Sequence, residues 1–421
     1  MVKKLNFYQL FNLFIYLLFL IINNNYCNSE KSSTKQNTNK YSVLRIRAEN
    51  EIQLNFLMNE FLNNSAKLDF WKEPSKIKED VHVMVAKGSI LNDFYNRLNK
   101  YNLIIQIMID DVNELIIKPT NNNNNGGRFS LGKYKSFGDI INYMNALAIN
   151  YPNRVSVQPI GSTHEGRQIP LIKIGTNNNN NLIEKPAIWG MGISSIIGYE
   201  TQPLIKQFVD QLDWFIVPLL NPDGYEYSRS SSDPEIRLWR KNRSPAQCTQ
   251  INTGLFTPPN TQCCQGVDLN RNFDWFFGQV GSSSDPCSEI FSGNFAFSEP
   301  ETKSVRDFIS QQQGKIKTFM TFHSYSQILM YPFGHSLPAQ ALQSTYGTKY
   351  TVGTGADTLY PASGGSEDWA KGRMGVKFSF LFELRPEDSV YDGFLLPESQ
   401  IVPTARETWE AVKIIGSLSR Y

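Results

Sequence analysis

The run Trp214-Phe215-Ile216-Val217-Pro218-Leu219-Leu220 has the continuous apolar character of a buried strand. It ends in Asn221-Pro222-Asp223-Gly224-Tyr225, which is a strong turn signal. Further strand-like patterns lie at residues 155–160, 171–174 and from residue 187, and residues 137–149 have helical spacing. Strands that alternate with helices predict an α/β sheet with helices on its faces.

A smaller and separate pattern precedes this domain. Alternating strand-like runs and two stretches with helical spacing predict a compact α+β module over residues 41–118. The Asn- and Gly-rich residues 119–131 predict a flexible linker. Arg128 in this linker is either a site of proteolytic nicking or part of a connection that is never cut. Residues 132–421 then form the main domain.

The N-terminus predicts entry into the secretory pathway. Lys3 and Lys4 precede an apolar run over residues 10–22, which is shorter than the roughly 20 residues of a membrane span. We interpret residues 1–29 as a signal peptide, with a short membrane anchor as the alternative. No later stretch predicts a membrane span. We therefore expect a protein of the extracellular space or the endolysosomal lumen.

Charge and cysteine usage narrow the class of protein further. The net charge of +2 in 421 residues gives no indication of nucleic-acid binding. Four cysteines follow the leader, and an even number in a secreted chain favours two disulfides over free thiols. Adjacent Cys263 and Cys264, with no His nearby, do not match the spacing of a zinc finger.

The polar stretch Gly266-Val267-Asp268-Leu269-Asn270-Arg271-Asn272 contains residues suited to binding a carboxylate. Arg271 offers a planar fork of donors, and Asn270 adds an amide NH₂ group. Three other stretches carry polar groups of the same kind. They are the basic run 238–244, residues 321–327 with one His, and the strand-like residues 378–385 with one carboxylate.

Together these stretches resemble the pancreatic-type zinc metallocarboxypeptidases. The matching motifs are residues 239–244, 266–272, 323–331, 360–369, 380–385 and 391–400. The resemblance implies an α/β/α carboxypeptidase domain with a mixed central sheet, preceded by a ferredoxin-like activation segment. It covers most of the chain after residue 41 and implies action on peptide or protein C-termini by a monomer.

One central motif of that family is missing. Its zinc has three protein ligands, namely the His and Glu of one HxxE motif and a later His. The resemblance assigns the later His to His323, for which the alternative is a core histidine. After the strand that begins at residue 187, no HxxE occurs, and a helix-length piece with its Arg is absent. The chain there reads Gly190-Met191-Gly192-Ile193-Ser194-Ser195-Ile196-Ile197-Gly198-Tyr199-Glu200.

The remaining family positions are present, and the resemblance gives each a role. Glu383 corresponds to the general base, and Arg243 to a clamp on the scissile carbonyl. Asn270 and Arg271 correspond to the grip on the substrate carboxylate. Other roles are the closing Tyr360, the subsite walls Tyr325 and Phe394, the specificity residue Glu367, and Asp268, which orients the missing His. A surface Glu on a turn is the alternative for Glu367.

The resemblance also implies a disulfide between Cys264 and Cys287, which leaves Cys248 to pair with Cys263. With one of three ligands, we expect the chain to hold little zinc. His82, His164 and His335, the other three histidines, do not repeat HxxE. Zinc-dependent release of C-terminal residues, expected to be basic, is therefore one hypothesis. A protein that binds peptide C-termini without hydrolysis is the second, and an incomplete gene model of an active enzyme is the third.

Overall fold

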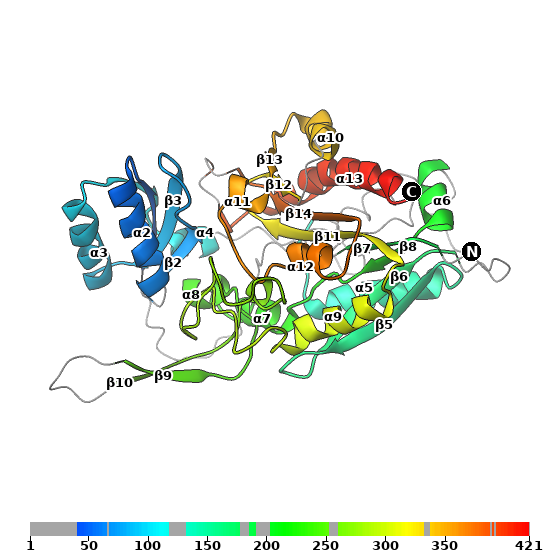
Figure 1. The fold of residues 1–421 in the computed structure, drawn as a ribbon, viewed down its shortest axis with the longest axis horizontal. Coiled ribbons are helices and arrows are strands. Elements are labelled where there is room, and N and C mark those ends of the chain that lie inside the picture. Colours follow the sequence, from blue (N-terminus) through cyan, green and yellow to red (C-terminus); the bar gives the residue numbers. More distant parts are fainter. Residues whose placement is uncertain are drawn as a thin grey trace.

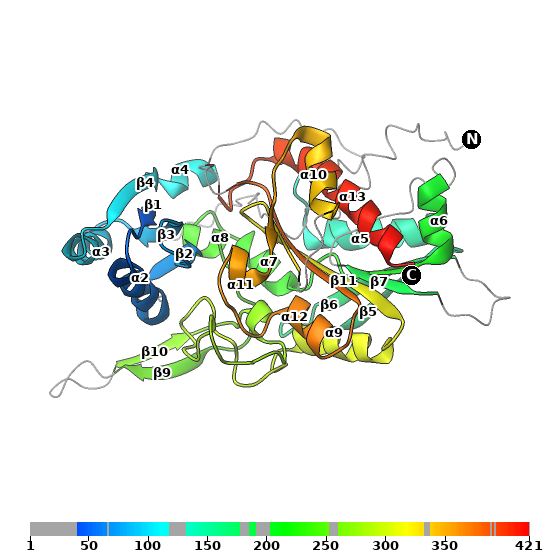
Figure 2. The same ribbon diagram turned by 45° about the horizontal axis from the view of Figure 1, so that its top comes forward.

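The computed structural model describes residues 40–64, 67–117, 132–176, 185–190, 203–251, 260–331, 337–387, 390 and 393–420. The expected leader, the linker and the stretch that follows Gly190 lie outside these residues. Two units stand side by side, a small one at the N-terminus and a larger one that contains the long central sheet (Figures 1 and 2).

The larger unit is built on an eight-stranded sheet with the order β13-β12-β14-β11-β7-β8-β6-β5. Neighbours from β14 to β8 are parallel, whereas β12/β14, β6/β8 and β5/β6 are antiparallel, so the sheet is mixed as predicted. Its strands are β5 (Val155–Ser162), β6 (Gln168–Ile174), β7 (Ala187–Gly190), β8 (Asp213–Ile216), β11 (Ile316–Ser324), β12 (Ile328–Met330), β13 (Thr351–Gly353) and β14 (Phe378–Leu384).

Alternate side chains of these strands point to opposite faces of the sheet and pack into two separate cores. The large unit therefore has three layers, with helices on both faces of the sheet. One core joins the sheet to α5 (Phe137–Asn150), α6 (Pro203–Gln211), α10 (Leu337–Tyr346) and α13 (Ile401–Leu418). The other joins its opposite face to α9 (Pro300–Gln311) and α12 (Ser366–Gly372). On β8, Trp214 and Ile216 enter the first core and Phe215 enters the second.

Shorter elements carry the connections on the side of the sheet that faces the small unit. They are α7 (Pro222–Ser228), α8 (Pro234–Arg237), the hairpin of β9 (Gln247–Ile251) and β10 (Asn260–Cys264), η1 (Leu269–Arg271), α11 (Gly355–Thr358) and η2 (Glu398–Gln400). The disulfide Cys248–Cys263 joins β9 to β10, and the disulfide Cys264–Cys287 ties β10 to the loop after η1. Both implied pairings are therefore confirmed.

The small unit is a four-stranded antiparallel sheet with the order β2-β3-β1-β4. It comprises β1 (Tyr41–Arg47), α2 (Glu51–Asn64), β2 (Leu68–Lys72), β3 (Asp80–Ala86), α3 (Ser89–Lys100), β4 (Ile104–Ile109) and α4 (Val112–Ile117). Helices α2 and α3 cover one face of this sheet. Its other face packs on the large unit through a shared cluster that includes Val43, Trp71, Tyr325 and Leu395.

Candidate active-site cavity

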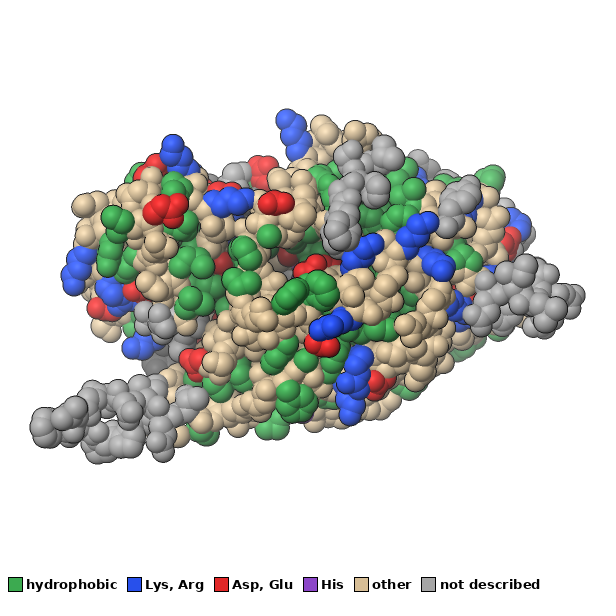
Figure 3. Space-filling view, viewed as in Figure 1, with side chains coloured by type: hydrophobic (Ala, Val, Ile, Leu, Met, Phe, Trp, Pro, Cys, Tyr) green, Lys and Arg blue, Asp and Glu red, His purple; other side chains and the backbone are tan. Residues whose placement is uncertain are grey.

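A cavity of about 690 Å³ lies where the two units meet, and both units line it. In the space-filling view, hydrophobic side chains border the junction of the units (Figure 3). Nearly all of the sequence-predicted site residues line the cavity. They are Asp268, Asn270, Arg271, His323, Tyr325, Tyr360, Glu367, Glu383 and Phe394. Residues 68–73 of the small unit also contribute to its wall.

His323 and Glu383 lie opposite each other on neighbouring strands. The parallel register of β11 and β14 pairs their Cα atoms, so both side chains reach the end of the sheet that faces the cavity. The Nε2 atom of His323 lies 2.9 Å from the Thr321 hydroxyl. Burial, followed by the charge of Arg240, lowers the pKa of His323 to about 4. This imidazole is therefore neutral at physiological pH.

The short helix η1 positions the predicted carboxylate-binding pair. Asp268 caps it by accepting a hydrogen bond from the Asn270 N–H at 3.0 Å. Arg271 is only 3% exposed, and its guanidinium donates to the Gly281 carbonyl at 2.6 Å and to the Tyr360 hydroxyl at 2.9 Å. These bonds hold the Arg271 side chain in one orientation at the cavity wall.

The structure corrects the position of the second arginine. Arg243 does not line the cavity, because its guanidinium stacks 3.6 Å above the Tyr227 ring and 4.9 Å from the Trp239 ring. Arg240, three residues earlier, points into the cavity instead and donates to Asp268 Oδ2 from Nε at 3.1 Å and from Nη2 at 2.8 Å. Arg240, and not Arg243, is therefore the arginine of this run that lines the cavity.

This ion pair determines the ionisation of Asp268. Burial alone would raise the pKa of the carboxyl, but Arg240 and Arg271 outweigh it and lower the pKa below its ordinary value of 3.8. Asp268 therefore contributes stability above pH 4, and this contribution is lost as the pH falls through the lowered pKa. The carboxylate that would orient the missing His is neutralised by an arginine.

We expect Arg240→Met to destabilise the protein by about 2–3 kcal/mol at pH 7, because it leaves Asp268 charged, buried and without its closest partner. In the variant, burial raises the pKa of Asp268, so the loss should shrink as the pH falls from 7 toward 4. The matched change Arg243→Met should cost about 1 kcal/mol, with little pH dependence. Urea unfolding at several pH values measures both, and equal losses would contradict the assignment.

The small unit reaches into the cavity with polar and aromatic side chains. Glu73 accepts a hydrogen bond from the Tyr360 hydroxyl at 3.0 Å. Trp71 packs edge-on against Phe394 with ring centroids 5.6 Å apart. The Tyr325 hydroxyl lies 2.8 Å from His82 Nδ1. Three predicted substrate-contacting residues therefore also contact the small unit, which forms part of the cavity wall.

Two further acidic groups shape the electrostatics of the cavity. Burial raises the pKa of Glu367 to about 7, with the neighbouring Asp368 adding to the shift. Burial and the charge of Glu289 likewise raise the pKa of Asp69 to about 7. Asp69, Glu73 and Glu289 were not predicted from the sequence, because their role depends on contacts between the two units.

The described residues do not fit the zinc that the resemblance implies. Of the family ligand set, they contain His323 alone. Asp268, the carboxylate that would orient the missing His, is paired with Arg240. The positive charge of Arg240 also helps to lower the pKa of His323. Within the part of the chain that the structure describes, the group of three His, Cys, Asp or Glu residues close enough together to hold a metal is His164, Glu299 and Glu301, and these do not line the cavity.

The fold and the cavity define a peptidase-type domain with an attached activation unit. The family model described as "Zinc carboxypeptidase" matches residues 140–194 and 193–411, and the model described as "Carboxypeptidase activation peptide" matches residues 44–118. The two segments matched by the first model meet at residues 193 and 194. The chain belongs to the pancreatic-type zinc metallocarboxypeptidases.

Individual relatives agree with this placement. Carboxypeptidase A2 of Mus musculus is 38% identical over 411 residues, covering 89% of this chain and 92% of the relative. Carboxypeptidase B of Rattus norvegicus is 34% identical over 416 residues, covering 90% and 93%. The crystal structure of carboxypeptidase A from Helicoverpa armigera superposes with a TM-score of 0.75 at 27% identity, covering 91% of this chain and 98% of that one.

Proposed function

We propose that the chain, as its sequence stands, is a secreted carboxypeptidase-family protein that binds peptides with a C-terminal Lys or Arg and does not hydrolyse them. The observation that carries this proposal is the combination of groups in one cavity. Arg271, Asn270 and Glu367 supply binding groups, whereas His323 is the one family zinc ligand among the described residues.

The carboxylate-binding part of the proposal does not depend on a metal. The buried guanidinium of Arg271 is oriented by the Gly281 and Asn270 carbonyls. Binding a ligand therefore costs little further conformational entropy of this side chain. Arg240 adds a second positive charge to the same cavity. A peptide carboxylate bound to Arg271 would form charge-assisted hydrogen bonds, whereas an amide would lose them.

The side-chain preference rests on Glu367. Its carboxylate lines the cavity at the start of α12, where Ser366 Oγ donates to it at 3.3 Å. No Lys or Arg forms an ion pair with Glu367 among the described residues, so a cationic side chain of a ligand can provide the missing partner. Leu and other apolar C-terminal residues would instead leave this carboxylate buried and without compensation.

The linkage between Glu367 and ligand gives a pH prediction. Because a cationic ligand binds the ionised form and the pKa of free Glu367 is about 7, affinity for an Arg-terminated peptide should rise about tenfold from pH 5.5 to pH 8. Affinity for the Leu-terminated peptide should not rise. His323, with a pKa of about 4, does not titrate in this range. Calorimetry at four pH values measures both.

The matched control for this prediction is Glu367→Ile, which should remove both the preference for Arg and its pH dependence. If the unmodified protein bound peptides with C-terminal Arg and C-terminal Leu equally well, Glu367 could not be the residue that selects the C-terminal side chain. The ligand-binding experiments use protein cleaved within residues 119–131 and separated from the activation unit, because Glu73 and Trp71 otherwise occupy the cavity wall.

The second candidate function is hydrolysis by an enzyme with a complete site. The observation that favours it is the retention of Asp268, Tyr360 and Glu383 at family positions around the cavity. If a transcript carries an in-frame segment with HxxE between Gly190 and Glu200, that product would be a zinc carboxypeptidase for basic C-termini. Sequencing the transcript across this region distinguishes the two candidates.

The predicted leader and the family support secretion of the chain. Pancreatic carboxypeptidase relatives support secretion, and the two disulfides suit an oxidising compartment. Among the described residues, no helix combines the length and the apolar character needed to cross a bilayer.

A further inference from the structure

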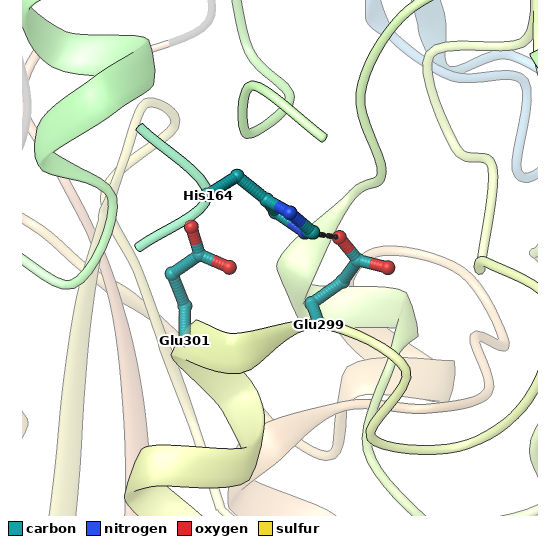
Figure 4. A group of neighbouring side chains, drawn as sticks. All are labelled: His164, Glu299 and Glu301. Carbon is teal, nitrogen blue, oxygen red and sulfur yellow. Dashed lines mark hydrogen bonds and ion pairs between the residues drawn. The ribbon is translucent and has the colours of Figure 1, made fainter. Parts of the chain in front are cut away.

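A cluster of His and carboxylates lies outside the cavity, between two segments far apart in the sequence. His164 sits in the turn between β5 and β6 and is exposed to solvent. Glu299 precedes the first residue of α9, and Glu301 lies in the first turn of that helix. Both glutamate side chains rise from the start of α9 toward the turn that carries His164 (Figure 4).

The potential ligand atoms of these three residues all lie within 4.8 Å of one another. His164 Nε2 is 2.9 Å from Glu299 Oε2. Below them, the Asn242 amide donates to Glu299 at 2.8 Å and to Glu301 at 3.0 Å. The Asn242 oxygen accepts from the Val267 N–H at 2.9 Å, which fixes the NH₂ group toward the two carboxylates. The acids are therefore held side by side.

Glu301 provides the second observation. Its side chain is fully buried, and its Oε1 atom has no hydrogen-bond partner among the described residues. An unsatisfied buried acceptor is costly, and two adjacent carboxylates repel each other. Burial raises the pKa of Glu301 to about 7. No Lys or Arg of the described residues forms an ion pair with Glu299 or Glu301, so the carboxylates lack a countercharge.

We propose that His164, Glu299 and Glu301 bind a divalent cation of the Zn²⁺ type. One imidazole nitrogen and two carboxylate oxygens are a donor set that suits Zn²⁺ better than Ca²⁺ or Mg²⁺, which take oxygen ligands only. The exposed side of His164 gives the ion an entry path and leaves a position for water. An ion there would use the free Oε1 of Glu301 and replace the proton between His164 and Glu299.

The surrounding charges favour a cation over an anion. Two other acids, Glu165 and Asp223, lie beside the turn that carries His164. Asp223 forms an ion pair with Arg167 at 2.8 Å, and Glu165 forms one with Arg243 at 3.6 Å. The two arginines are thus balanced by acids other than Glu299 and Glu301. The bound ion would join the β5–β6 turn to the start of α9.

The test uses the full chain, freed of metal with a chelator and titrated with Zn²⁺ by calorimetry at pH 7.5. We expect one ion per chain in the unmodified protein. His164→Asn and Glu301→Gln should each weaken binding at least 50-fold. His323→Asn, which alters the cavity instead, should leave the affinity unchanged. No binding by the unmodified chain, equal binding by His164→Asn, or loss in His323→Asn would each overturn the proposal.

Two further readouts separate a lost ligand from a damaged fold. Saturating Zn²⁺ should raise the thermal midpoint of the unmodified chain and of His323→Asn by about 3–6 °C, and leave the midpoints of His164→Asn and Glu301→Gln unchanged. Zinc X-ray absorption should show a single imidazole among oxygen ligands. Two or more imidazoles would place the ion elsewhere.

Discussion

A peptide with a free C-terminal Arg should bind the processed protein about 50-fold more tightly than the same peptide with an Arg-amide end. The difference corresponds to roughly 2–3 kcal/mol, the range of hydrogen bonds to charged groups. The physical reason is the buried position of Arg271, a residue that is only 3% exposed. A neutral amide leaves this guanidinium without the anion that would compensate its removal from water.

Isothermal calorimetry with the two peptides measures this ratio on a single protein preparation, so any difference in folding cancels. Arg271→Met should reduce the ratio to near one. Arg243→Met is the matched control, because Arg243 stacks on Tyr227 outside the cavity and should leave the ratio unchanged. Equal affinities for the acid and the amide in the unmodified protein would end the docking hypothesis.

The carboxylate-binding motif could be predicted from the sequence because its residues are contiguous. Asp268, Asn270 and Arg271 lie within one short helical turn, and local hydrogen bonds set their geometry. His323 and Glu383 were assigned to the site by the resemblance, and the parallel register of β11 and β14 places their Cα atoms opposite each other.

The position of Arg240, rather than Arg243, at the cavity shows where local pattern fails. Both arginines belong to the same basic run, and nothing in that run tells which side chain turns inward. The partners decide this, namely Asp268 for Arg240 and the Tyr227 ring for Arg243. Likewise, the predicted strand over residues 214–220 ends at Ile216 in the structure, because Pro218 has no N–H to continue the ladder.

Contacts between the two units could not be predicted from the sequence either, because their partners are far apart along the chain. Glu73 meets Tyr360 across 287 positions of the chain, and His82 meets Tyr325 across 243. Neither pair has a periodicity or spacing that identifies it. The activation unit could be predicted as a fold, whereas the side chains that it places in the cavity required the structure.

The processed chain should hydrolyse a peptide with C-terminal Arg no faster than its Glu383→Gln variant does. Grafting the HxxE-containing segment of a homologous carboxypeptidase between Gly190 and Pro203 should raise kcat/KM by at least about 10⁴-fold, well within the range of enzymatic rate enhancement. Hydrolysis of a chromogenic Arg-terminated substrate, with and without added Zn²⁺, measures both chains.

The size of this effect follows from the number of ligands. A catalytic zinc site needs three protein ligands, and the described residues offer His323 alone. The graft supplies the other two and gives Asp268 a His to orient, which competes with its present partner Arg240. Glu383 lies opposite His323 in the register of β11 and β14, so the residue that we propose as general base is already beside the restored site.

Two variants of the grafted chain test whether the gained hydrolytic activity comes from the cavity. His323→Asn should abolish the gained activity, because it removes the ligand native to this chain. His164→Asn should leave the activity intact, because His164 does not line the cavity. Zinc-dependent hydrolysis by the ungrafted chain, lost in His323→Asn, would show that other residues complete the site and would refute the proposal of binding without hydrolysis. A graft that folds, binds zinc through His323 and stays inert would show that more than the zinc ligands has been lost from the cavity.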